Sequence, residues 1–450
     1  MQPAPPLASS AESDESLYDL DFWLAYAANL ALVCANSLTF RFAEFVAALG
    51  GTEEVSGDLI RAGLIAAILA RLGLGRAIDH FGARRVWLLS GIAFLAGGAV
   101  FLFLARRPLS TEAQRLPHLL WLARIGYQVG LAGMFTCSIV HIQNQVPPHR
   151  RTEIIGSLGS SGFVGTICGT QLSDLIFHNL PEGNPRFLAM FGGTVFLGVL
   201  HSAIVFRLTR NDVHTRPDVT PGPFKLLLRY WPGAIVLVAI AMGTSFAVST
   251  VFLTRFATLH GLRGIGMYFL PYSVTAFACR WFLRDWGTTL GRHRMVVWGL
   301  SGLTIGQLLF LFVKSDWLFI PPGMVTGFGH ALLFPAVVSI GAGRFPVQYR
   351  GSGTTLVLGF IEVGTAVAAP LLGMLLDAGN AGGATTGFSW MFVASSGVAG
   401  LVLLFYSATA ARHPDHDPHD RAPATRPVPT VEAESDGGDL IAVPVDDEQR

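Results

Sequence analysis

Twelve long apolar stretches separated by short polar segments constrain this chain more than any other feature of its sequence. A helix needs about 20 mainly apolar residues to cross a bilayer, so twelve crossings need roughly 240 residues. The chain has 450 residues, of which 14% are charged, whereas soluble domains carry about 25%. We therefore expect an all-α polytopic membrane protein. The expected spans are 22–48, 57–75, 86–105, 118–141, 154–177, 187–207, 231–255, 264–283, 295–313, 321–342, 354–376 and 388–409.

The placement of arginine predicts how the chain is oriented. Most arginines between the expected spans fall in every second loop. In membrane proteins the loops that are rich in lysine and arginine face the cytoplasm. A cluster at Arg106, Arg107 and Arg115 is the one discordant feature. We expect a multi-pass protein of a bacterial plasma (inner) membrane with both termini in the cytoplasm. The net charge of +1 gives no sign of a nucleic-acid partner.

The two halves of the chain repeat each other. Residues in the first half match residues in the second at constant offsets and in the same order. The matched pairs are Arg71/Arg280, Gly82/Gly291, Arg85/Arg294, Arg151/Arg350, Gly165/Gly364 and Thr166/Thr365. We expect two pseudo-symmetric six-helix bundles, as parallel repeats form in transporters. The expected division is a disordered N-terminus (1–21), a first bundle (22–207), a linker (208–230), a second bundle (231–410) and a disordered tail (411–450).

One short segment, 75–85, combines glycines, a carboxylate and an arginine pair in what we expect to be a cytoplasmic loop. These residues are Gly75, Asp79, Gly82, Arg84 and Arg85. Their spacing resembles the signature loop between helices 2 and 3 of the major facilitator superfamily. A basic loop in some other polytopic protein is the alternative interpretation.

The resemblance implies a role for this segment as a conformational gate. In that family the carboxylate, here Asp79, sits against the start of span 11, and Arg84 or Arg85 would join a charge lock that holds the cytoplasmic side closed. The second repeat departs from the pattern, since Thr288 stands where Asp79 stands. Arg71 and Arg280 are expected to brace the inner loops.

Two ionisable residues near the middle of their spans are candidates for proton coupling. Glu362 and His330 both lie at about midplane depth, where ionisable groups are costly and are often functional. A buried carboxyl group and an imidazole can exchange protons in the physiological range, so together they could carry a proton with a solute. The alternatives are a neutral Glu362 bonded to a neighbouring helix and a His330 that only packs.

A second group of polar residues falls in spans that line the cavity in the resembled family. Arg41, Glu44, Arg124 and Arg255 are expected in the outer third, where they suggest an anionic substrate or an outer gate. The alternative is that their side chains reach the membrane interface, above all for Arg255. Asn29 and Asn36 in span 1 are further candidates for the pathway.

Together these features predict a secondary transporter that moves a small solute by alternating access, coupled to protons. The alternative is a transporter-like solute sensor or membrane scaffold without transport. We expect no enzyme activity, cofactor or metal, and a monomer whose partners are solute, protons and lipid. The histidine- and aspartate-rich segment 413–420 could bind a divalent metal, but a solvated tail is the preferred interpretation.

Overall fold

The computed structural model describes residues 18–51, 53–107, 118–262, 265–380 and 386–409. Within these ranges every regular element is a helix. The expected disorder of residues 1–21 is wrong for its last residues, because Asp19 caps a helix that begins at Leu20. Residues 1–17 and 411–450, with the possible metal site in the tail, lie outside the described residues.

The helices up to residue 208 form one group that shares a hydrophobic core. Asp19 caps the first helix, because its side chain accepts the main-chain N–H of Phe22 at 2.9 Å. A short 3₁₀ turn, Thr39–Arg41, joins the first two helices. The helices are α1 (Leu20–Leu38), α2 (Phe42–Ala48), α3 (Glu53–Phe81), α4 (Ala83–Leu104), α5 (His118–Asn144), α6 (Arg151–Asn179) and α7 (Asn184–Leu208).

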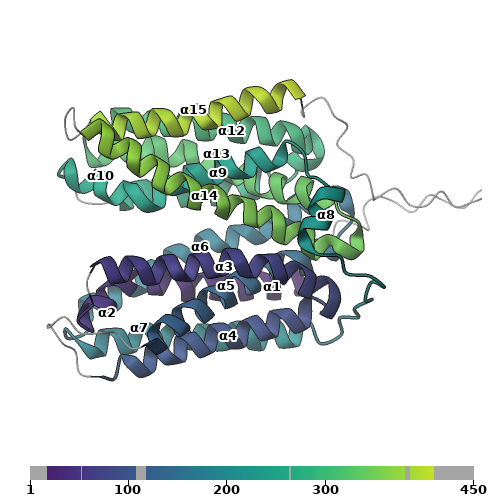
Figure 1. Ribbon diagram of the computed structural model, residues 1–450, viewed down its shortest axis with the longest axis horizontal. Coiled ribbons are helices and arrows are strands. Elements are labelled where there is room, and N and C mark those ends of the chain that lie inside the picture. Colours follow the sequence, from purple (N-terminus) through teal and green to yellow (C-terminus); the bar gives the residue numbers. More distant parts are fainter. Residues whose placement is uncertain (1–17, 52, 108–117, 263–264, 381–385, 410–450) are drawn as a thin grey trace, which may run out of the picture.

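The helices after residue 230 form a second group, with cores of their own. Figure 1 shows the two groups as two layers, with α4 and α7 in one and α12 and α15 in the other. A π-helical turn, Val248–Phe252, joins the first two of these helices. The helices are α9 (Ile235–Ala247), α10 (Leu253–Leu259), α11 (Gly266–Phe282), α12 (Arg292–Leu309), α13 (Ile320–Gly343), α14 (Arg350–Asn380) and α15 (Thr386–Thr409).

Nine helical segments in the described residues are long and apolar enough to cross a membrane. When α1 with α2 and α9 with α10 are each counted as one segment, the helices α3, α6 and α11 are additional to these nine. These three pack across the contact between the two groups, α3 against α14 and α6 against α11. They are therefore partly shielded from lipid, and this permits a more polar sequence than a lipid-facing helix has.

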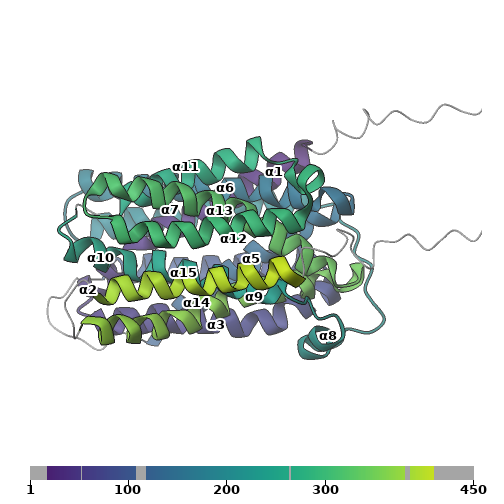
Figure 2. The ribbon, with the colours of Figure 1, turned by 90° about the horizontal axis from the view of Figure 1, so that it is seen from above.

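The linker between the groups lies at one end of the molecule, which we call the α8 end after the short helix α8 (Pro223–Arg229). Figures 1 and 2 show α8 at this end, where α15 also ends. Leu226 of α8 packs in a small cluster with Phe345 and Tyr349. The Tyr349 hydroxyl donates to the carbonyl of Val219 at 3.0 Å, so the linker is attached to the turn before α14.

The segment 75–85, expected to be a loop, is almost entirely helical. Helix α3 continues to Phe81, α4 begins at Ala83, and only Gly82 lies outside them. Gly82 has a φ of 85°, which side chains other than glycine rarely adopt. The expectation was wrong because the apolar stretch ends before the helix does. Segment 76–81, half polar and half apolar, continues the helix until Gly82 permits the chain to reverse.

Three helices of each group form the contact between them, which we call the seam. On one side lie α3, α5 and α6, and on the other α11, α13 and α14. The internal repeat relates the two sides, because α3 matches α11 and α6 matches α14. The contact of α3 with α14 therefore has a counterpart in the contact of α11 with α6.

Candidate functional site

At the α8 end of the seam, α3 meets the first turn of α14. The Asp79 carboxylate accepts the main-chain N–H of Ser352 at 3.0 Å and also accepts its hydroxyl. A Cβ on Gly75 would lie 2.6 Å from the Cα of Ser352, so only glycine allows this approach. Asp79 thus occupies the place at the start of the eleventh span that the family resemblance implies. A carboxylate there is favoured by the unpaired N–H groups of a helix start.

The two arginines after Gly82 do not form the charge lock that the resemblance implies. Arg84 donates to the main-chain carbonyl of Arg210 at 2.8 Å and lies over the ring of Phe206. Phe206 belongs to α7 of the first group of helices and Arg210 belongs to the linker, so neither partner lies in the second group. Arg85 is exposed. In this conformation Arg84 holds the linker against α4, and neither side chain crosses the seam in the described residues.

A tyrosine before α1 makes another contact across the α8 end. The Tyr18 hydroxyl donates to Glu153 Oε1 at 2.8 Å, and its ring stacks on Trp281 of α11 with centroids 6.2 Å apart. Arg284 lies over the same ring at 5.3 Å. Burial raises the pKa of the Tyr18 hydroxyl to about 12, so it remains a donor to Glu153 at physiological pH.

Deeper in the seam, an ion pair joins the two groups of helices. Arg71 of α3 donates to both carboxylate oxygens of Glu362 on α14, from Nε at 2.6 Å and from Nη2 at 2.5 Å. Its Nη1 also donates to Thr136 Oγ1 at 2.8 Å. The Arg71 side chain is 7% exposed and that of Glu362 is 33% exposed. The expectation that Arg71 braces a loop was wrong, because its two bonds to Glu362 run across the seam.

His330 has a partner of its own. Its Nδ1 lies 2.6 Å from the hydroxyl of Tyr272. The rings of Phe246 and Phe163 approach it with centroids at 4.8 and 6.2 Å. The structure thus gives Glu362 and His330 different partners, Arg71 and Tyr272, instead of pairing the two as a single proton site.

Arg280 of α11 was expected to brace an inner loop, but the structure buries it at the seam. It is 6% exposed, and its Nε has no hydrogen-bond partner in the described part of the chain. Its guanidinium carbon lies 4.7 Å from the ring centre of Phe163 on α6 and 5.4 Å from that of Phe334 on α13. The match with Arg71 at a constant offset is the sequence signal that could have assigned Arg280 to the seam.

The hydrogen bonds between the two groups of helices gather in the half of the molecule nearer α8. They include the bonds of Asp79 and Arg71 and a bond from Gln143 Nε2 to Thr354 Oγ1 at 2.7 Å. The ring contacts of Phe163 with Tyr272 and His330 lie at the inner limit of this region. Among the described residues, the cross-seam bonds therefore hold the α8 end closed.

At the opposite end of the molecule, the polar residues predicted to line the pathway do not form one cluster across the seam. Arg41 pairs with Glu44 at 2.9 Å and with Asp174 of α6 at 2.7 Å, beside a cavity of about 680 Å³. Arg124 is buried, with its guanidinium 4.6 Å from the ring centre of Phe42. Arg255 is exposed on α10, in the second group. The structure brings Arg41 and Glu44 together but leaves Arg255 apart from them.

The two asparagines of α1 differ in their surroundings. Asn29 is buried and donates to Ser161 Oγ at 2.8 Å, which ties α1 to α6 within the first group. Its Oδ1 is buried without a partner among the described residues. Asn36 is partly exposed. Asn29 therefore acts as a packing contact in this conformation.

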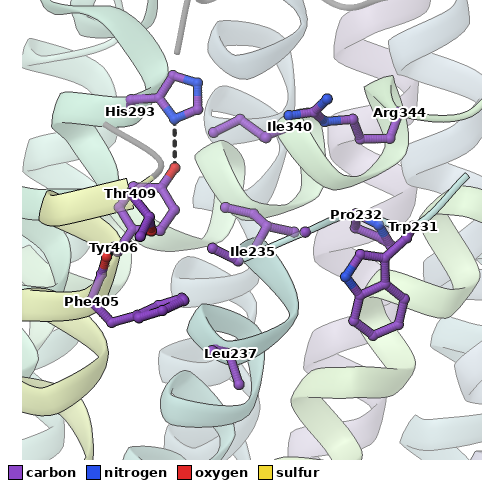
Figure 3. A pocket seen from close by; sticks show the side chains of 12 residues that line it. Trp231, Pro232, Ile235, Leu237, His293, Ile340, Arg344, Phe405, Tyr406 and Thr409 are labelled. Atoms are coloured by element: carbon purple, nitrogen blue, oxygen red, sulfur yellow. Dashed lines mark hydrogen bonds between the residues drawn. The ribbon is translucent and has the colours of Figure 1, made fainter. Parts of the chain in front are cut away.

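A further cavity of about 420 Å³ lies at the α8 end of the second group. Figure 3 shows its lining, with Trp231 and Arg344 on one side and the hydrogen bond between His293 and Tyr406 on the other. The Nδ1 of His293 lies 2.6 Å from the Tyr406 hydroxyl. All its lining residues lie between Trp231 and Thr409, so this cavity is lined by the second group of helices alone.

These features define a polytopic helical membrane protein whose repeated halves meet at a polar seam. The family model of the Major Facilitator Superfamily matches residues 22–284 and 265–438. The chain belongs to the Major Facilitator Superfamily, a family of transporters.

Individual proteins resemble it at low identity. YhhS of Escherichia coli strain K12, an uncharacterised transporter of this type, is 23% identical over 378 residues, covering 82% of this chain and 87% of that protein. The E. coli fucose:proton symporter FucP matches with a TM-score of 0.67 and 16% identity, covering 86% of this chain and 99% of that one. The proton:xylose symporter XylE matches with a TM-score of 0.64 and 14% identity, covering 86% and 95%.

Proposed function

We propose that this protein is a secondary active transporter that moves a small solute by alternating access, coupled to protons. The observation that carries the proposal is the ion pair of Arg71 with Glu362. It joins the two groups of helices at the level of the membrane, and its carboxylate is 33% exposed while its arginine is 7% exposed. A titratable group that is reachable by water and that holds the two halves together can link protonation to their separation.

The mechanism follows from what the proton does to this pair. Protonation of Glu362 removes the charge that Arg71 binds and leaves Arg71 with Thr136 as its remaining partner. The α8 end is then held by Asp79 with Ser352 and by Gln143 with Thr354, which is a weaker closure. The seam opens at the α8 end, the solute leaves, and loss of the proton restores the pair.

The orientation of the protein in the membrane follows from the positions of its arginines. Arg76, Arg84, Arg85, Arg210, Arg294 and Arg344 all lie in segments of the α8 end. Positive residues remain in the cytoplasm, so we place the α8 end and both termini there, in the inner membrane of a bacterium. The conformation then has its cytoplasmic side closed. We propose a monomer that contacts solute, protons and lipid and does not bind nucleic acid.

The relatives support the class of function. YhhS is named as a transporter, and FucP and XylE are named as proton symporters. The likeness to the two symporters concerns the fold, so it supports proton coupling only as a mode that this fold can perform.

The test is flux in proteoliposomes loaded at alkaline pH and diluted into acidic buffer. A panel of radiolabelled sugars, amino acids and aromatic carboxylates is offered in turn. We expect saturable uptake of at least one class that a protonophore abolishes and that becomes independent of the gradient in Glu362→Gln. Asp58→Asn is the matched control. It also removes a carboxylate from an arginine, but the pair of Asp58 with Arg61 is exposed and lies within α3, so it does not cross the seam.

Two results would contradict the proposal. Solute that stabilises the protein against heat but is never carried across the membrane would favour the sensor interpretation. Flux that is saturable but has the same dependence on the gradient in Glu362→Gln as in the unmodified protein would remove the proton role of this residue.

A further inference from the structure

The two repeats make the same cross-seam contact with different chemistry. Arg71 on α3 and Arg280 on α11 occupy matching positions, and Arg71 binds Glu362 on α14. The offset that aligns Arg151 of α6 with the first residue of α14 aligns Phe163 with Glu362. Arg280 lies 4.7 Å from the ring centre of Phe163. The arginine is therefore kept in both repeats, but the carboxylate opposite it is present in only one.

The environment of Arg280 leaves its charge incompletely compensated. Its Nε is buried without a hydrogen-bond partner, and no carboxylate of the described residues forms an ion pair with it. A Cβ on Gly159 would overlap its Nη1, so the guanidinium lies directly against α6. Contact with the rings of Phe163 and Phe334 supplies part of the compensation. A buried guanidinium is fully satisfied only by an acceptor such as a carboxylate.

The surroundings of Arg280 are aromatic, with one polar pair. Phe163, Phe246 and Phe334 surround His330 with ring centroids between 4.8 and 6.2 Å from its own. The hydroxyl of Tyr272 lies 2.6 Å from the same imidazole. Phe163 and Phe246 are partly exposed, whereas His330 and Tyr272 are buried. This combination of an arginine, a hydrogen-bonding pair and flat apolar surfaces is typical of a small-ligand site.

The location fits a ligand that arrives from the end opposite α8. The contacts of Phe163 with Tyr272 and His330 lie at the inner limit of the region where the seam is held closed. Arg280 and Phe163 match Arg71 and Glu362 in the repeat, so we expect the two pairs at similar depth, and a solute that enters between the two groups of helices from the other end reaches both.

From these observations we propose that the transported solute is an organic carboxylate with a planar apolar body. Its carboxylate binds Arg280 through two parallel hydrogen bonds, in the way Glu362 binds Arg71, and its body lies among Phe163, Phe246 and Phe334. This assignment rests on the proposed transport function and adds the class of solute. The solute supplies from outside the acceptor that the second repeat lacks.

The experiment measures binding at equilibrium, with the intact purified chain in detergent. Benzoate, cinnamate and 4-hydroxybenzoate are each compared with the corresponding neutral amide by thermal unfolding and by calorimetric titration. We expect the carboxylates to bind and the amides to bind at least about tenfold more weakly, because a site built for an ionic hydrogen bond rejects an analogue that lacks it. Arg280→Gln should abolish the preference for carboxylates.

A designed variant sharpens the test. Phe163→Glu places a carboxylate where the first repeat has one, so it should pair with Arg280 and weaken benzoate binding at least about thirtyfold by competition within the protein. Phe163→Gln is the matched control, because it loses the ring and has nearly the size of glutamate but carries no charge. It should therefore weaken benzoate binding at least about tenfold less than Phe163→Glu does. The Phe163→Glu protein should unfold at a temperature no lower than that of the unmodified protein, which distinguishes competition from misfolding. If the Phe163→Glu protein does not fold, Arg280→Lys is tested in its place. Lysine keeps the positive charge but cannot form the bidentate pair with a carboxylate, so benzoate binding should weaken.

The outcomes separate this proposal from the proposed function. Equal binding of acids and amides, no binding of any acid, or full benzoate binding by a folded Phe163→Glu protein would overturn the carboxylate assignment. Proton-driven flux of a neutral sugar without carboxylate binding would do the same while leaving the transport function intact. Carboxylate binding that requires Arg280, in a protein that shows no flux, would support the site and contradict transport.

Discussion

Replacing Glu362 by glutamine should shift the seam toward opening at the α8 end. The carboxylate accepts from Arg71 Nε at 2.6 Å and Nη2 at 2.5 Å. Glutamine has nearly the same shape, but only one of its two terminal atoms accepts, and the other is an N–H₂ group that faces the guanidinium donors. The substitution therefore removes one charge-assisted hydrogen bond and the ionic attraction while leaving the packing of α14 almost unchanged.

The size of the effect can be derived from the exposure of the two side chains. Removing one partner of a fully buried ion pair costs about 3–5 kcal/mol. Here Glu362 is 33% exposed, and water that reaches its carboxylate reduces the loss to about 2 kcal/mol. Because 1.4 kcal/mol corresponds to a factor of ten, the ratio of closed to open molecules should fall about thirtyfold. A population that is about 99% closed would become about three-quarters closed.

Spin labels on the two sides of the seam can measure this shift. Asn144 at the end of α5 and Gln348 just before α14 are exposed and lie at the α8 end in different groups of helices. Pulsed dipolar spectroscopy of labelled cysteines at these positions should show a longer distance appear in Glu362→Gln.

The control and the refuting result both follow from the pairing. Asp58→Asn also removes a carboxylate from an arginine, Arg61, but the pair is exposed and lies within α3, so the distance distribution should not change. If Glu362→Gln has the same distribution as the unmodified protein at every pH, the ion pair does not hold the seam and the reasoning fails.

Four further substitutions test the α8 end. Asp79→Asn keeps the acceptors for Ser352 but loses the charge at the start of α14, and we expect about 1 kcal/mol less closure and several-fold slower transport at normal membrane insertion, measured by flux and membrane immunoblot. Gly75→Ala places a Cβ 2.6 Å from the main chain of Ser352, so the melting temperature should fall and the spin-label distance should lengthen. Arg85→Ala should change closure by less than about 0.5 kcal/mol, because Arg85 is exposed, whereas Arg84→Ala should loosen the linker and increase its proteolysis.

Sequence reasoning predicted the helical class and the family because both depend on patterns that are local or periodic. Apolar stretches of sufficient length predict crossings without knowledge of contacts. The same reasoning misjudged where α3 ends, because a helix can continue beyond the apolar stretch until a residue such as Gly82 adopts a positive φ. Hydropathy indicates which part of a segment prefers lipid, and it contains little information about how far the backbone stays helical.

Partners across the seam could not be predicted in the same way. Arg71 and Glu362 are separated by 291 residues, and no local pattern specifies that the two side chains meet. Each was singled out alone, with Glu362 assigned to proton coupling with His330 and Arg71 to bracing a loop. The missing information was the packing of α3 on α14, which places the guanidinium and the carboxylate face to face.

The internal repeat explains how one duplicated seam can serve two tasks. If Phe163 were a carboxylate as Glu362 is, both arginines would be paired within the protein, and only protonation of both carboxylates would release the α8 end. Because one position has an aromatic ring, Arg280 is held mainly by rings, whose attraction does not depend on pH, and it can accept an anion from outside. If both proposals hold, the proton acts on one cross-seam contact and the solute on its counterpart. Since both contacts lie between the same two rigid groups of helices, each ligand changes the equilibrium that the other one depends on, which is the condition for coupling the two movements.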